Sequence, residues 1–361
     1  MVSSPDQVSR SVSRECPIIG RGSTSSKRYA KYSLRSFVGS LGNLLRLHVT
    51  RPHIKLACLE LNNVNANFRP QKESTSLIWV SVLGALCLVA GLTFRAGVAL
   101  LPPGIFQDTF LLGLSALFLS VAVMTRRGQS LRRYWEIPFA FFVFTIAGAT
   151  DTIFLHGFID NVLHETPSTN NPLASTILGT VLAQSVSTLS IVIPIILLTM
   201  ASGNDLSSIF IDKARIRRGL VVSIISFLGF YVFTGLGLAQ GLFPNNGITL
   251  SRFIALTPAL LVLVLSNGIR EELWFRGIFL KKYGKFLRPL PSNMLAAIIF
   301  TSFHIQVQYT RSLLPFLGIT LILGLWLGYL MQRSGNIVAP GIFHAGSDIP
   351  IYLAFLSYTS T

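Results

Sequence analysis

The chain contains, at residues 77–100, the stretch LIWVSVLGALCLVAGLTFRAGVAL, in which Arg95 is the only charged residue. A helix needs about 20 mostly apolar residues to cross the hydrocarbon core of a bilayer, so this stretch is long enough for one crossing. Comparable segments follow it, separated by short polar loops. They lie at residues 108–124, 137–155, 174–200, 219–240, 253–276, 293–309, 312–331 and 337–357. We therefore predict an all-α fold, a polytopic membrane helix bundle of eight to nine transmembrane helices.

Composition agrees with this prediction and excludes two other classes of protein. Charged residues make up 12% of the 361 residues, about half of the ~25% that is usual in soluble domains. Hydrophobic residues make up 51%, whereas a disordered chain would be poor in large apolar side chains. The net charge of +16 does not indicate nucleic-acid binding, because much of it separates segments that are too apolar to be solvated.

Residues 1–72 differ from the rest of the chain. They contain 11 serines, and 12 lysines and arginines against 3 acidic residues. This composition is typical of an organellar transit peptide, and no apolar core of a secretory signal is present in it. We predict a plastid transit peptide and a chloroplast membrane, thylakoid or inner envelope. The alternative is a basic tail on a protein of the bacterial plasma membrane or the endoplasmic reticulum. After this arm we expect N-terminal transmembrane helices at 73–245 and a C-terminal core at 246–361.

Basic residues between the apolar segments indicate the orientation in the membrane. They form clusters at 126–133, 213–218 and 281–288. With nine crossings all three clusters fall on one face, and the positive-inside rule makes that face cytoplasmic or stromal. The opposite face receives Asp160 and Glu165.

Ionisable residues inside the apolar segments are the candidates for function, because a charge within the bilayer is costly. The first group is REELWFRG at residues 270–277. Adjacent helical residues point about 100° apart, so Glu271 and Glu272 cannot share one role. Glu272 and Arg276 are spaced for an i,i+4 ion pair. Glu271 has no such partner, which suits a general base, although the group would also serve as an ion-paired anchor for a helix end.

Two further groups follow in the last quarter of the chain. FTSFH at residues 300–304 places His304 midway along an apolar segment. HAGSD at residues 344–348 places His344 and Asp348 on one helical face. Each histidine taken alone is most simply a hydrogen-bonded structural residue. Together the three groups form a polar cluster that a bare scaffold does not need.

The three groups resemble the motifs of the CAAX-prenyl-protease and bacteriocin-processing family (Abi or CPBP), which includes the eukaryotic type-II CAAX endopeptidases. The family motifs are EExxxR, FxxxH and HxxxN/D in this order, and the resemblance covers residues 250–357. It implies a membrane-embedded endopeptidase in which Glu271 activates water and His304 helps to hold it. By the same resemblance, His344 and Asp348 stabilise the oxyanion. Supporting roles fall to Glu272, Arg276 and Phe300.

Position 348 departs from the commoner form of the third motif, in which an asparagine amide can donate to an oxyanion. An ionised carboxylate only accepts hydrogen bonds and would repel the developing charge. We therefore expect Asp348 to orient His344, which lies one turn away on the same face.

No cofactor is predicted. Two histidines and a glutamate are also a catalytic zinc set, but the HExxH spacing of helical zinc sites is absent from the sequence. A separate trio, His156, Asp160 and His164, is spaced for one face of a helix and would be a metal site there. A solvated turn at the membrane surface is the simpler interpretation.

Three functions are compatible with these patterns. The intact motifs favour an endopeptidase that takes a peptide or protein substrate from the inside face, within the lipid bilayer. A membrane scaffold of the same fold would instead bind or stabilise organellar partner proteins without cleaving them. In a transporter, Asp151 and Gln184 would line a path, but no repeated pair of broken helices is evident.

Overall fold

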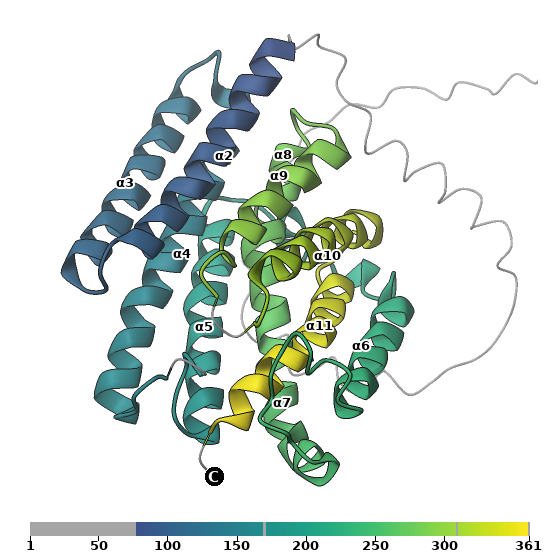
Figure 1. The fold of residues 1–361 in the computed structure, drawn as a ribbon. Coiled ribbons are helices and arrows are strands. Elements are labelled where there is room, and N and C mark those ends of the chain that lie inside the picture. The colour runs from purple at the N-terminus through teal and green to yellow at the C-terminus, as the bar shows by residue number, and fades with distance from the viewer. Residues whose placement is uncertain (1–76, 169–170, 308–309, 360–361) are drawn as a thin grey trace, which may run out of the picture. The chain divides into compact units, whose positions relative to one another are not determined.

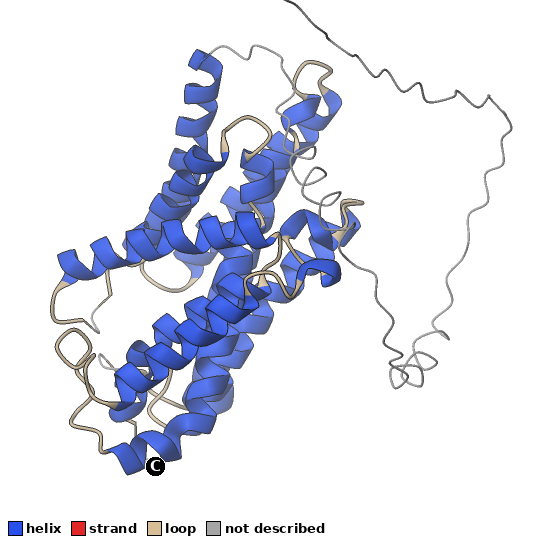
Figure 2. Ribbon diagram, turned by 90° about the vertical axis from the view of Figure 1, so that its right-hand side faces the viewer, coloured by secondary structure: helices blue, strands red, loops and turns tan. Residues whose placement is uncertain are grey.

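The structure is a computed structural model that describes residues 77–168, 171–307 and 310–359. The chain divides into two units, residues 1–69 and 70–361, and every described residue belongs to the second. The predicted transit peptide at 1–72 lies outside the described residues. Within the described ranges the elements are helical and none is a β-strand, which confirms the all-α class (Figure 2).

The helices follow the predicted apolar segments. Their bounds are Leu77–Leu100 (α2), Ile105–Arg127 (α3), Glu136–Phe158 (α4), Ile177–Ala201 (α5), Leu220–Gly235 (α6), Leu250–Glu271 (α7), Leu280–Tyr283 (α8), Pro289–Ser302 (α9), Leu313–Ser334 (α10) and Val338–Ser357 (α11). Short 3-10 or π-helical turns occupy Arg132–Tyr134, Ile159–Leu163, Leu206–Ile209, Lys213–Arg215 and Glu272–Gly277. Each predicted segment overlaps one of the longer helices, and α8 is a short addition.

Among the described residues, six helical segments are long and apolar enough to cross a membrane. They contain α2, α3, α4, α5, α7 and α10. The other predicted segments form α6 with 16 residues, α9 with 14, and α11 with 20. Two of these helices are short, and α11 carries His344 and Asp348. The prediction of eight to nine crossings therefore includes helices that are shorter or more polar than a full apolar span.

The polarity of the helices is inverted relative to a protein in water. Large apolar side chains such as Leu197, Ile225 and Ile322 are exposed, and exposed apolar surface of this extent marks contact with lipid or a partner. The side chains of Glu272 and Arg276 are instead completely buried. This distribution is the one expected of an integral membrane protein.

The C-terminal helices bring the polar residues together. The helices α3, α4 and α5 pack in sequence, α5 contacts α7, and α7 lies beside α11, which also packs on α6 (Figure 1). A Cβ atom at Gly268 of α7 would lie 2.8 Å from the backbone nitrogen of Ala345 in α11, closer than Cβ atoms normally approach. The carbonyl of Gly341 is also within contact range of this position. The two backbones thus touch one helical turn from Glu272 and directly beside His344.

The basic clusters border one another at one end of the helices. Lys282 of α8 donates a hydrogen bond to the carbonyl of Ser208 at 3.2 Å. Lys285 forms an ion pair with Glu136, the first residue of α4, at 2.7 Å. These contacts connect three loops that the positive-inside rule assigns to one face.

Candidate active site

The first motif lies where α7 changes into the π-helical turn Glu272–Gly277. The backbone nitrogen of Ile278 bonds to the carbonyl of Leu273, five residues earlier, at 3.1 Å. Such turns are rare in proteins and are found frequently at functional sites. The indole N–H of Trp274 donates to the backbone carbonyl of Phe144 in α4 at 2.9 Å, which fixes the turn against the N-terminal helices.

His344 of α11 is held between the two glutamates of this motif. Its Nδ1 lies 2.8 Å from Oε1 of Glu272, and its Nε2 lies 3.6 Å from Oε2 of Glu271. The angle of about 100° between adjacent helical side chains therefore places the two carboxylates at opposite nitrogens of one imidazole. Oδ1 of Asp348 also lies 3.6 Å from Nε2. The imidazole is thus surrounded by acceptors and is only 2% exposed.

Glu272 supports His344 from a completely buried position. Its Oε1 accepts a hydrogen bond from Nη1 of Arg276 at 2.5 Å, so the predicted ion pair is present. The guanidinium of Arg276 also lies over the ring of Phe300, with Cζ 4.4 Å from the ring centroid. Removing one partner of a buried pair leaves an uncompensated charge, so each of these two side chains requires the other.

His304 lies in the turn after α9, which ends at Ser302, and not midway along a helix as predicted. Its Nδ1 is 3.0 Å from the carbonyl of Phe300, and its backbone N–H bonds to the carbonyl of Thr301. The histidine thereby satisfies carbonyls that a helix end leaves free. The Phe300 ring lies between the two histidines, with centroid distances of 4.7 Å to His304 and 5.6 Å to His344.

Polar residues that the motifs do not include complete the site. Nδ2 of Asn267 donates to Oδ2 of Asp348 at 2.7 Å. Arg270 pairs with Oε1 of Glu271 at 3.1 Å, donates to Oγ of Ser187 at 2.5 Å, and also donates to Oδ1 of Asn267. Glu271, for which no local partner was predicted, is thus paired with the arginine directly before it.

Further polar side chains connect to this group from α4, α5 and α11. The hydroxyl of Tyr352 donates to Oε1 of Gln184 at 2.9 Å, and the carboxylate of Asp151 interacts electrostatically with Arg270. The residues considered for a transporter path thus adjoin the candidate active site. Their sequence signal was a polar side chain inside an apolar segment, which is costly unless it has a function or a partner.

Within the described part of the chain, no group of three or more His, Cys, Asp or Glu side chains is arranged to hold a metal ion. The trio at 156, 160 and 164 lies at a helix end. Nδ1 of His164 is 3.2 Å from the backbone carbonyl of Asp160, and His164 has a left-handed backbone with φ of 53°. This trio therefore forms a helix terminus.

The sequence model of the family described as Type II CAAX prenyl endopeptidase Rce1-like matches residues 253–349. This range contains all three motifs and lies inside the C-terminal core predicted at 246–361. The resemblance inferred from the motifs is confirmed over this range. No curated protein and no solved structure matches the chain.

Proposed function

We propose that the chain is an intramembrane-site endopeptidase in which Glu271 activates water for attack on a peptide bond. The premise is that residues 253–349 match a family of membrane endopeptidases. The observation that carries the proposal is the pair of carboxylates on one buried imidazole. Glu272 binds Nδ1 of His344 at 2.8 Å and is occupied, whereas Glu271 faces Nε2 at 3.6 Å, a separation that leaves it available to water.

In the proposed reaction a water molecule bound by Glu271 and His304 loses a proton to the Glu271 carboxylate. Its oxygen attacks the carbonyl carbon of the scissile peptide. The resulting oxyanion accepts a hydrogen bond from the Nε2–H of protonated His344, whose charge is balanced by Glu272 at Nδ1. Glu271 then transfers its proton to the leaving nitrogen as the C–N bond breaks, which restores the carboxylate.

The neighbouring polar residues have positioning roles in this proposal. Arg270, 3.1 Å from Glu271, holds the base in one orientation. Asp348 accepts from Asn267 on one oxygen and directs the other toward His344, so the pair orients the imidazole.

The proposed substrate is a peptide or protein segment that reaches the site from the face with the basic clusters. We further propose that residues 1–72 direct the chain to a chloroplast membrane, thylakoid or inner envelope. Import of the full chain, fused to a fluorescent protein, into isolated plastids tests the location. A fusion that stays outside the organelle would contradict it.

The test of the activity compares new protein N termini, measured by mass spectrometry, in membranes with the wild-type chain or with Glu271→Gln. We expect a set of N termini that depends on the wild-type chain and disappears in the variant, because loss of a general base slows a reaction about 10²- to 10⁴-fold. Glu136→Gln is the matched control, since Glu136 pairs with Lys285 away from the site. Equal sets from wild type and Glu271→Gln would contradict the proposal.

A non-proteolytic scaffold is separated from an endopeptidase by rescue of a null mutant. An endopeptidase requires Glu271, so Glu271→Gln should fail to rescue when its level in the membrane equals that of the wild type. Full rescue by this variant would instead support the scaffold.

A further inference from the structure

A groove opens between α3, α4 and α5 at the ends that carry the arginines of residues 126–133. It encloses about 350 Å³, which is within the range of small-ligand sites. The small side chains of Ala122 and Ala201 leave room between the helices. The larger side chains that line it are apolar or aromatic: Leu119, Val123, Trp135, Phe139, Phe142 and Leu198.

A positively charged side chain, that of Arg126, lies at the edge of this groove. Arg126 lines it, is exposed, and lies over the indole of Trp135 with Cζ 4.6 Å from the ring centroid. Among the described residues no carboxylate forms an ion pair with Arg126, and the nearest acid along the chain, Glu136, is paired with Lys285. The groove is thus apolar inside and positive at its edge.

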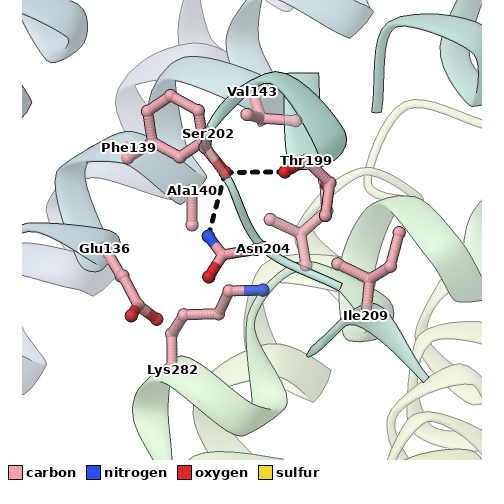
Figure 3. A pocket seen from close by; sticks show the side chains of 10 residues that line it. Glu136, Phe139, Ala140, Val143, Thr199, Ser202, Asn204, Ile209 and Lys282 are labelled. Carbon is pink, nitrogen blue, oxygen red and sulfur yellow. Dashed lines mark hydrogen bonds between the residues drawn. The ribbon is translucent and has the colours of Figure 1, made fainter. Parts of the chain in front are cut away.

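A second positive group lies behind the groove. A small pocket that shares Phe139 and Ser202 with the groove contains the side chain of Lys282 (Figure 3). Lys282 is 6% exposed, and its one hydrogen bond to the described residues is to the carbonyl of Ser208. The pocket encloses about 10 Å³, which is room for one water molecule. It cannot admit a headgroup, and Glu136, which also lines it, offsets the charge of Lys282, so Arg126 is the cation that a ligand in the groove would meet.

We propose that the groove binds an acyl chain of an anionic phospholipid, with the lipid phosphate on Arg126. Apolar walls match the chain, and the guanidinium matches the phosphate. The positive-inside rule places this end of the helices at the leaflet whose anionic lipids attract basic residues. Two comparison ligands separate the contributions of chain and charge. A zwitterionic lipid has the same acyl chains without the net charge, and a free phosphate ester has the charge without an acyl chain.

Native mass spectrometry of the purified full chain tests this with dioleoyl phosphatidylglycerol, dioleoyl phosphatidylcholine and glycerol phosphate. We expect the wild type to retain phosphatidylglycerol in preference to the other two. Arg126→Gln should weaken phosphatidylglycerol binding about fivefold and leave phosphatidylcholine unchanged, because one basic residue at the surface contributes about that factor. Arg217→Gln is the control, because it makes the same charge change in another basic loop. It should change the binding of neither phosphatidylglycerol nor phosphatidylcholine.

The groove itself is tested by filling it. Ala122→Trp should abolish phosphatidylglycerol retention, and Ala122→Leu, a smaller change, should reduce it if the tryptophan variant does not fold. Val121→Trp, on an exposed face of the same turn of α3, is the matched control and should bind normally. Equal retention of the two lipids, wild-type binding by Arg126→Gln, or unchanged binding by the folded Ala122 variants would overturn the proposal.

Discussion

At residue 348 the carboxylate is paired with an amide from the neighbouring helix. Asn267 donates to Asp348, and Arg270 donates to the side-chain oxygen of Asn267, which fixes the direction of the amide. The third motif of the resembled family, HxxxN/D, commonly has its amide at the position of Asp348. In this chain the amide belongs to Asn267 on the neighbouring helix α7. An amide and a carboxylate are therefore still in contact beside His344.

Exchange of the two residues tests whether this pairing matters. Asn267→Asp alone puts two carboxylates in contact, and we expect cleavage that depends on Glu271 to slow about 5- to 100-fold, as for an uncompensated buried polar group. In the double variant Asn267→Asp/Asp348→Asn, an amide again faces a carboxylate, and the new carboxylate lies beside Arg270. We expect the double variant to recover most of the wild-type rate of N-terminus formation. A double variant as slow as Asn267→Asp would contradict the pairing.

Contacts between residues close in sequence were predictable, and contacts between residues far apart in sequence were not. The ion pair of Glu272 and Arg276 was predictable because a helix brings residues four apart together. Asn267 and Asp348 are 81 positions apart, and no local spacing rule connects them. The motifs contain the proposed reacting groups, while the residues that contact those groups from elsewhere became identifiable only with the packing of α7 against α11.

At the scale of elements, the close approach of α7 and α11 sets the geometry of the site. Gly268→Ala would place its Cβ against the backbone of Ala345, which cannot move aside as a side chain can. We expect the helices to separate at a cost of about 1–3 kcal/mol in stability, together with slower cleavage. Gly318→Ala in α10 is the control, because a Cβ there meets nothing within 4 Å. Thermal unfolding in detergent measures the stability of both variants. Equal unfolding temperatures for Gly268→Ala and Gly318→Ala would contradict a close contact between α7 and α11.

The N-terminus of α5 is bound by a carboxylate outside the membrane-spanning segments. Oε2 of Glu165 accepts from the backbone N–H groups of Ser175 at 2.6 Å and Thr176 at 2.8 Å. Burial acts to raise the pKa of Glu165, but hydrogen bonds from Thr176 and Ser175 outweigh it and hold the pKa below its usual range. The ionised form therefore stabilises the folded state.

This pKa makes the stability depend on pH in one direction. A group with a lowered pKa in the folded state contributes stability above its unfolded pKa, about 4.3 for Glu, and the contribution is lost as the pH falls through the folded pKa. Glu165→Gln should therefore lower the unfolding temperature at pH 7, and the difference from wild type should shrink below about pH 4. An equal difference at both pH values would show that the charge of Glu165 is unimportant.

The existence of the helices was predictable, but some of their ends were not. An apolar segment at 293–309 predicted a helix, and α9 ends at Ser302 within it. The reason is local: the carbonyls of Phe300 and Thr301 bond to His304 in a turn, and apolarity alone carries no information about this turn. The predicted place of His304 within a helix was wrong for the same reason.

At the scale of the whole molecule, the matched range 253–349 depends on a helix outside it. Arg95, the single charge in α2, donates from Nε to the carbonyl of Ser302 at 3.0 Å and from Nη2 to Oε1 of Gln306 at 2.9 Å. Along the chain, the two acceptor residues Ser302 and Gln306 each lie two positions from His304. The buried ring of Phe94, the residue before Arg95, also lies 6.0 Å from the rings of Trp274 and Phe303, so α2 reaches the candidate site through these hydrogen bonds and through ring contacts.

Arg95→Leu tests whether the N-terminal helices position the site. The substitution keeps α2 apolar and removes both hydrogen bonds to the turn. We expect cleavage that depends on Glu271 to slow by about tenfold or more, since about tenfold is the value of a single charged hydrogen bond. Thr93→Val is the control on the same helix, because among the described residues the Thr93 hydroxyl bonds only to the carbonyl of Val89 in its own helix. The unfolding temperature should change little in either variant, since the turn is small compared with the helix packing. If Arg95→Leu cleaves as fast as Thr93→Val, the turn holds His304 without the Arg95 hydrogen bonds, and the charge in α2 has no part in positioning the proposed reacting groups.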